Sequence, residues 1–199
     1  MTNPLEERVI ELTRKAGVLR PRDLDAVGIP RVYLQRLCRK GGIERLQRGL
    51  YCLPERSAGE FATLAEVAKR VPSGVVCLLS ALRFHELTTQ TPHEVWLALD
   101  RKSRKPRLDL PVRVVRFSAE ALSAGYEVHV IDQVPVRVYG PAKTVVDCFK
   151  YRNKIGLDVA LEALQDYLRQ RKGTVDELWR FAKICRVSNV MRPYLEAVL

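Results

Sequence analysis

The sequence predicts an α+β fold, in which an N-terminal winged helix-turn-helix is followed by a larger α+β domain. Three observations lead to this prediction. Residues 3–53 read as three short helices and a hairpin, and the later residues read as strands followed by helices. Between these regions lies Pro54–Glu60, which is rich in Pro, Ser and Gly and poor in apolar residues. We therefore place the two domains at residues 1–56 and 57–199.

The first helix is predicted over residues 4–16. Asn3 can cap it, Pro4 suits its first position, and Gly17 follows its last residue. A second helix begins at Pro21 and ends near residue 28, and a third runs from Pro30 to about residue 41 after a tight glycine turn.

Residues 43–53 consist of two short extended runs on either side of Gly49, a pattern that predicts a small hairpin. A hairpin directly after the basic third helix is the element order of a winged helix-turn-helix.

The second region begins with a predicted helix over residues 61–71 and a short helix over 81–86, which Ser80 can cap. Valine-rich runs predict a small mixed or antiparallel sheet, and Asp132-Gln133 predicts a tight turn within an antiparallel pair. The strands are expected at 94–99, 112–117, 126–131 and 134–139, and further helices at 141–151, 157–170, 174–186 and 189–198.

The charge of the chain favours a polyanionic partner. Lys and Arg total 34 against 23 Asp and Glu, a net charge of +11, which is typical of proteins that bind nucleic acid. On a helical wheel of the third helix, Leu34, Leu37 and Cys38 face the core, and Val32, Gln35, Arg36 and Arg39 face solvent. This arrangement is the one that a helix needs to enter a major groove.

We assign base reading to Gln35, Arg36 and Arg39 of the third helix, because Gln can pair with adenine and Arg with guanine. Phosphate anchoring is assigned to the basic residues that flank this helix or lie in the hairpin, namely Arg31, Lys40, Arg45 and Arg48. The alternative is that the basic face is merely solvated.

A second basic segment lies between two predicted strands. Its basic residues are Arg101, Lys102, Arg104, Lys105 and Arg107, five of seven positions with no acid among them. It is a possible second nucleic-acid contact, to DNA phosphate or to RNA, or a solvated loop.

Enzymatic interpretations find little support, and we expect no catalysis, no cofactor and no metal. Residues 140–144 (GPAKT) resemble the end of a phosphate-binding loop but lack its glycine spacing, and they fit a plain helix start. Ser80 and His85 lack the glycine frame of a nucleophile elbow. The remaining histidines, His93 and His129, complete no metal motif.

Two further features suggest a cytoplasmic protein. The five cysteines form no C-x-x-C motif and are interpreted as buried free thiols. No apolar run is long enough to span a membrane, and the N-terminus lacks the pattern of a signal peptide.

The segment Gly17–Tyr51 resembles the N-terminal winged-helix segment of AbiEi-type antitoxins, the regulators of type IV toxin–antitoxin systems. Later segments are similar to the C-terminal antitoxin region of the same family: Leu79–Pro92, Val136–Phe149, Lys154–Leu164 and Met191–Leu195.

The resemblance implies a transcriptional autorepressor that binds an inverted-repeat operator in double-stranded DNA and counteracts a nucleotidyltransferase-like toxin. It places the DNA role on the helix 30–41 and the wing 43–53. We expect a monomer in solution that pairs on DNA. The alternatives are an orphan regulator without a toxin, an antitoxin that acts by direct protein contact, and an RNA-binding protein.

Overall fold

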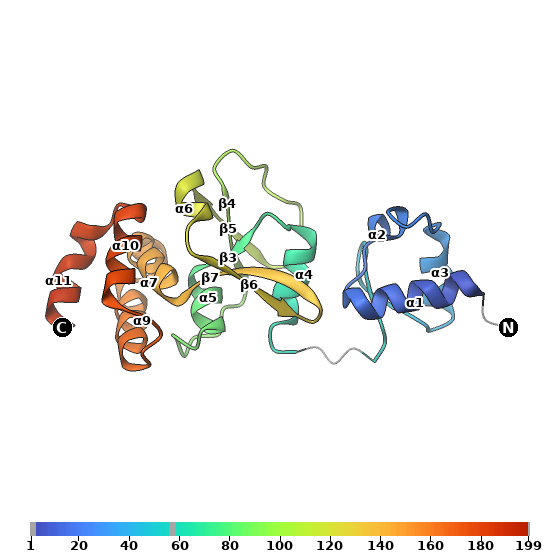
Figure 1. Cartoon of the computed structure of the whole chain (residues 1–199), viewed down its shortest axis with the longest axis horizontal. Coiled ribbons are helices and arrows are strands. Elements are labelled where there is room, and N and C mark those ends of the chain that lie inside the picture. Colours follow the sequence, from blue (N-terminus) through green and yellow to red (C-terminus); the bar gives the residue numbers. More distant parts are fainter. Residues whose placement is uncertain (1–2, 56–58, 199) are drawn as a thin grey trace. The chain divides into compact units, whose positions relative to one another are not determined.

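A computed structural model describes residues 3–55 and 59–198 (Figure 1), and internal contacts divide the chain into two compact units. The first contains the described part of Met1–Pro72 together with Val130–Val136, and the second contains Ser73–His129 and the described part of Arg137–Leu199. The predicted domain boundary between residues 56 and 57 lies outside the described residues and stays a prediction.

The first unit begins with the predicted order of three helices and a hairpin. Its elements are α1 (Pro4–Ala16), α2 (Pro21–Asp25), α3 (Val32–Arg39), β1 (Glu44–Gln47), β2 (Leu50–Cys52) and α4 (Ala62–Arg70). The Asn3 side chain accepts a hydrogen bond from the Leu5 amide at 3.0 Å, which confirms the predicted cap of α1. The second and third helices are shorter than predicted.

The wing is a small antiparallel sheet. Strands β1 and β2 pair with each other, and Leu19 adds an isolated bridge to Tyr51 in β2. The helices close over this sheet around one apolar cluster, which is formed by Val9, Leu19, Leu24, Ile29, Leu34, Leu37 and Ile43. A winged helix-turn-helix is thus present as predicted.

The remaining elements form a sheet followed by helices. They are β3 (Val75–Val76), α5 (Leu78–Phe84), β4 (Val95–Asp100), β5 (Val112–Phe117), α6 (Ala119–Ser123), β6 (Tyr126–Ile131), β7 (Val134–Tyr139), α7 (Pro141–Lys150), α8 (Arg152–Ile155), α9 (Leu157–Arg169), α10 (Val175–Cys185) and α11 (Ser188–Val198). The sheet is mixed, in the order β5-β4-β3-β7-β6. Strand β3 runs antiparallel to β4 and parallel to β7, and β4 runs parallel to β5.

Strands β6 and β7 are neighbours joined by Asp132 and Gln133, whose φ angles are 49° and 63°. Two left-handed residues in succession make the tight turn that the sequence predicts, and so short a connection requires the two strands to be antiparallel.

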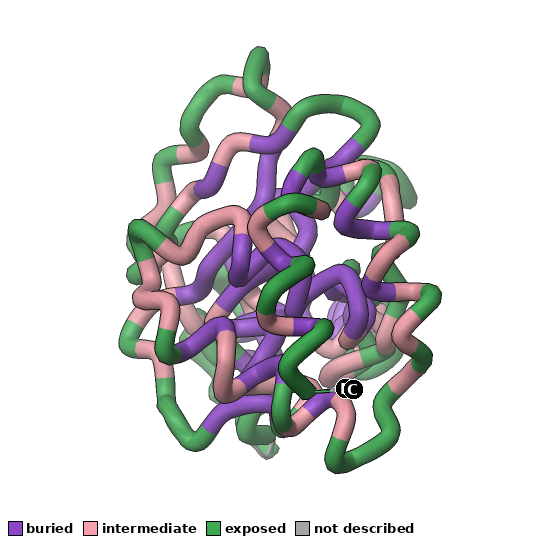
Figure 2. Tube along the Cα trace, turned by 90° about the vertical axis from the view of Figure 1, so that its left-hand side faces the viewer, coloured by how far each residue is buried: buried purple, intermediate pink, exposed green. Residues whose placement is uncertain are grey.

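Helix α7 is the central helix of the second unit. All its residues from Ala142 to Phe149 are buried, because α5, α9, α10 and α11 pack around it. Figure 2, which views the chain from the side of the C-terminal helices, shows buried segments inside and exposed segments outside. The helix predicted over 141–151 is confirmed as α7, and the short α8 that follows it was not predicted.

One predicted cap is wrong. Helix α5 begins at Leu78 after Cys77, so that Ser80 lies inside the helix. The Ser80 hydroxyl instead accepts a hydrogen bond from the Trp96 amide of β4 at 3.0 Å. A bond to a neighbouring strand has therefore replaced the local capping bond.

Candidate nucleic-acid interface

Helix α3 has the two faces that the helical wheel predicts. Leu34 and Leu37 are 1% and 3% exposed and belong to the apolar cluster of the first unit. Gln35, Arg36 and Arg39 are exposed on the opposite side. The apolar contacts thus fix the orientation of the helix, and long donors project from it into solvent.

The wing adds two more exposed cations. The turn between β1 and β2 contains Gly49 with φ at 77°, a backbone conformation that glycine adopts without steric strain. Arg45 in β1 and Arg48 in the turn are exposed. The Arg45 Nε donates to the Gln47 carbonyl oxygen at 3.3 Å, a bond that holds the guanidinium along the wing.

Two of the predicted phosphate anchors form ion pairs with acids, Asp25 and Glu6, that were not predicted as partners from the sequence. The Arg31 Nε donates to Asp25 Oδ1 at 2.9 Å, and this guanidinium holds the pKa of Asp25 below its usual range. The Lys40 ammonium donates to both oxygens of Glu6 at 2.8 and 2.7 Å. Glu6 is 3% exposed, so this contact fastens α1 to the end of α3.

The remaining donors are not neutralised in this way. The Arg36 guanidinium lies 5.2 Å from the centre of the Tyr33 ring, which orients it without removing its charge. Among residues 3–55 and 59–198, the side chains of Gln35, Arg39 and Arg48 form no hydrogen bond or ion pair with the protein. These groups are available to an external acceptor.

The basic loop between β4 and β5 belongs to the second unit. All five of its predicted cationic residues, Arg101, Lys102, Arg104, Lys105 and Arg107, are exposed. Asp100 organises the start of the loop, since its side chain accepts from the Lys102 amide at 2.8 Å and its carbonyl accepts from Arg116 Nη1 at 2.8 Å. The loop therefore presents a second cluster of uncompensated positive charge.

The segment that resembles a phosphate-binding loop is a helix start, as predicted, with Pro141 in the first turn of α7. Its lysine cannot reach a phosphate, because Lys143 is fully buried and its Nζ lies 2.5 Å from Asp147 Oδ2. The Thr144 hydroxyl donates to the Tyr139 carbonyl at 3.0 Å.

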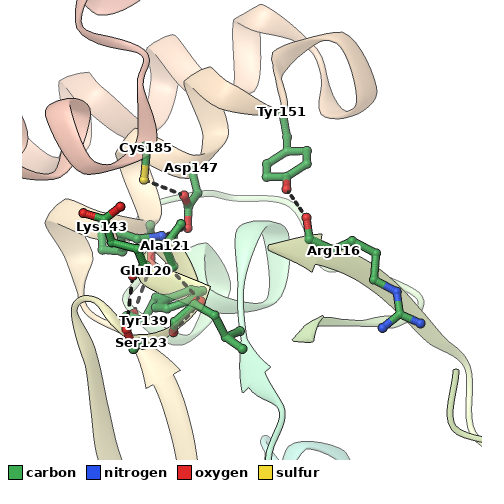
Figure 3. A network of polar contacts seen from close by, with 11 residues as sticks. Arg116, Glu120, Ala121, Ser123, Tyr139, Lys143, Asp147, Tyr151 and Cys185 are labelled. Carbon is green, nitrogen blue, oxygen red and sulfur yellow. Dashed lines mark hydrogen bonds and ion pairs between the residues drawn. The ribbon is translucent and has the colours of Figure 1, made fainter. Parts of the chain in front are cut away.

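A buried polar network, which was not predicted from the sequence, surrounds this lysine (Figure 3). Cys185 of α10 donates through Sγ to Asp147 Oδ1 at 3.4 Å, and the Lys143 ammonium lies 4.1 Å from the centre of the Tyr139 ring. Burial raises the pKa of Asp147 and raises that of Cys185 to about 12. The i, i+4 spacing of Lys143 and Asp147 was the available signal in the sequence.

The other polar candidates have structural partners. The His85 Nε2 lies 2.7 Å from the Tyr139 carbonyl oxygen, and His129 lies 3.2 Å from Glu127. His93 is exposed. No group of three His, Cys, Asp or Glu residues in the described parts of the chain is arranged to hold a metal ion.

Four of the five cysteines are buried free thiols, as predicted, while Cys38 of α3 is half-buried. No helix within residues 3–55 and 59–198 is long and apolar enough to cross a membrane.

The fold and the exposed basic helix define a protein of the winged helix-turn-helix class joined to an α+β region. Residues 7–54 match the family model of AbiEi antitoxin transcriptional regulators, which confirms the resemblance over this segment. The fold is similar to that of the RV2827C protein from Mycobacterium tuberculosis, at 17% identity and a TM-score of 0.63. That alignment covers 98% of this chain and 78% of the solved one. No curated protein matches the chain.

Proposed function

We propose that the protein is a DNA-binding autorepressor and antitoxin of an abortive-infection type toxin–antitoxin system. The observation that carries the proposal is the face of α3 opposite the core, where Gln35, Arg36 and Arg39 are exposed together. The match of residues 7–54 to the AbiEi antitoxin regulators supports the same function.

In this proposal α3 enters the major groove of an inverted-repeat operator. Gln35, Arg36 and Arg39 contact base edges, and Arg31, Lys40, Arg45 and Arg48 contact phosphates. Because Asp25 and Glu6 already compensate Arg31 and Lys40, we assign the stronger phosphate contacts to Arg45 and Arg48. Two copies of a solution monomer pair on the operator.

The domain division proposed is residues 1–56 for DNA binding and 57–199 for the antitoxin activity, with no catalytic step and no cofactor. The toxin is a nucleotidyltransferase-like enzyme, and the protein acts in the cytoplasm. Coexpression with a toxin gene adjacent to the regulator tests this half. Rescue of growth supports it, and lack of rescue in the presence of an active toxin would restrict the protein to transcription.

Binding of Arg36→Ala and Arg45→Ala to operator and random duplexes, at several salt concentrations, tests the DNA half. We expect Arg36→Ala to lose about 1–3 kcal/mol on operator DNA and far less on random DNA. Arg45→Ala weakens both, and its salt slope of log K falls by about 0.9.

The matched control is Arg169→Ala, because Arg169 is also highly exposed but lies on α9 of the second unit. It should bind both duplexes like the unaltered protein. Unchanged binding of both test variants would remove α3 and the wing from the interface.

The exposed loop 101–107 favours a second nucleic-acid contact. Replacement of Arg104 and Lys105 by alanine tests it, with a fall of up to about 1.8 in the salt slope expected if both reach phosphates. An unchanged slope would identify the segment as a solvated loop.

A further inference from the structure

Strand β6 is the last strand of the five-stranded sheet, and it carries exposed apolar residues at alternate positions. Tyr126, Val128 and Val130 are 37%, 58% and 71% exposed. Alternate residues of a strand point to the same face, so these three form one apolar stripe. We refer to them as the β6 stripe.

The backbone of the same three residues is directed toward the open edge of the sheet. In a hairpin with a two-residue turn, hydrogen-bonded pairs recur at every second residue from the turn. The Gly140 amide donates to the Gly125 carbonyl at 2.8 Å, which places the odd-numbered residues of β6 in the bonds to β7. The N–H and C=O groups of Tyr126, Val128 and Val130 therefore point away from β7.

The strand lacks the usual protection of an edge. Soluble proteins block exposed edges with lysine, proline, bulges or a covering segment, because an open edge pairs with other strands. Strand β6 contains no lysine, arginine or proline. In the described parts of the chain, no backbone hydrogen bond joins its outer edge to another segment.

We propose that this edge pairs with the same strand of a second copy of the chain, antiparallel and centred on Val128. In that register Tyr126 lies opposite Val130 of the second copy, and Val128 lies opposite its own equivalent. These are the residues whose backbone groups are directed outward, so three cross-strand pairs supply about six hydrogen bonds. An aromatic side chain opposite a β-branched one is a favourable cross-strand pair.

The two polar residues of the strand, Glu127 and His129, favour the same register. With Val128 at the centre, Glu127 lies opposite His129 of the second copy. Within one copy the same two side chains already contact each other, with Glu127 Oε2 3.2 Å from His129 Nε2. A shift of the second strand by two residues in one direction sets Glu127 against Glu127. Glu127 opposite Glu127 sets like charges against each other, which destabilises a sheet, and a shift in the other direction sets His129 against His129 and separates it from Glu127 of the second copy. The strand is thus complementary to itself in one register.

The pairing of two β6 strands is weak in the absence of DNA and stronger when two copies are held close together. One strand edge on each side buries far less than the roughly 1,600 Å² of a stable complex. Adjacent operator half-sites raise the effective concentration of one copy around the other. The role of the pair on DNA rests on the proposed function, but its formation does not, and it is tested without DNA.

Disulfide trapping of the full chain in a Cys38→Ser background tests the register, because the other four thiols are buried. In the proposed pair the two Val128 Cα atoms lie about 5.5 Å apart, within the range that a disulfide bridges. The two Val130 Cα atoms are offset by four residues, about 14 Å along the strand, which is beyond that range. Val128→Cys and the more exposed Val130→Cys are therefore matched variants.

Under mild oxidation by diamide we expect Val128→Cys to form dimers at least about tenfold faster than Val130→Cys. A Glu127→Cys chain mixed with a His129→Cys chain should form the heterodimer preferentially. Equal rates for Val128→Cys and Val130→Cys would indicate random collision and overturn the proposal. Slow dimer formation together with slow reaction of both thiols with a maleimide would show that another part of the chain covers the edge, and would overturn it too.

Sedimentation velocity at high protein concentration provides an independent measurement. We expect a concentration-dependent increase of the sedimentation coefficient, which Val128→Lys abolishes. Because both experiments contain no DNA, a negative result rejects the pairing of two β6 strands and does not affect the DNA-binding proposal.

Discussion

The buried ion pair between Lys143 and Asp147 gives a sharp test of how the second unit is stabilised. Both side chains are 0% exposed, and they lie one turn apart on α7. This helix packs against α5, α9, α10 and α11. Lys143→Met leaves Asp147 buried without its cation, and a buried charge that loses its partner destabilises a protein by about 3–5 kcal/mol. For a chain of this size that corresponds to a fall in melting temperature of about 6–20 °C.

The double variant Lys143→Met, Asp147→Leu separates the cost of an unpaired charge from the value of the pair. Apolar replacements of both partners remove the desolvation penalty, so we expect stability within about 1 kcal/mol of the unaltered protein. Thermal and urea unfolding followed by circular dichroism measure the four members of the cycle.

Lys15→Met is the matched control, because Lys15 forms an i, i+4 pair with Glu11 that is exposed on α1. We expect it to leave the melting temperature unchanged. The reasoning is refuted if the double variant is as unstable as the sum of the two single variants, or if Lys143→Met behaves like Lys15→Met.

Three further perturbations test individual contacts. Gly49→Ala should destabilise the wing by about 1 kcal/mol and weaken operator binding. An added Cβ meets no neighbouring atom there, so the cost comes from the positive φ angle alone. An unchanged melting temperature would contradict this. Glu6→Gln should lower the free energy of unfolding by about 1 kcal/mol, because it removes the carboxylate charge that pairs with the Lys40 ammonium, while Glu7→Gln at an exposed position should not. Burial lowers the pKa of His85 from 6.5, so the unfolded chain binds more protons and stability falls as the pH drops below about 6.5. His85→Asn should therefore flatten the decrease in melting temperature between pH 7 and pH 5, and an unaltered slope would assign the acid sensitivity to other groups.

The first unit could be predicted from the sequence because its signals are local. Asn3, Pro4 and the glycines mark the helix ends and turns within a few residues of where they act. The apolar spacing of α3 likewise determines which side of the helix remains exposed.

The features that escaped prediction depend on contacts between distant residues. Strand β3 is only two residues long and is defined by its pairing with β4 and β7. Ser80 can cap a helix, but its hydroxyl accepts a hydrogen bond from the Trp96 amide instead. Lysine side chains are usually exposed, and only the packing around α7 shows that Lys143 is buried.

The same limit applies to the candidate site. The sequence identifies which cations of α3 face solvent, because helical periodicity decides this. The pairing of Lys40 with Glu6 joins residues 34 positions apart, and no periodicity within α3 indicates it. The structure was therefore needed to distinguish the cations that are paired with acids, Arg31 and Lys40, from those that are free to contact DNA.

Photo-crosslinking from α3 tests the DNA-binding proposal most directly. A benzophenone amino acid in place of Gln35, which is exposed on the face opposite the core, should crosslink to bases within each half of the operator. The same group in place of Glu11 on α1 serves as the control and should give few crosslinks to bases. Crosslinks to bases from residue 11 with none from residue 35 would show that another surface of the protein contacts DNA.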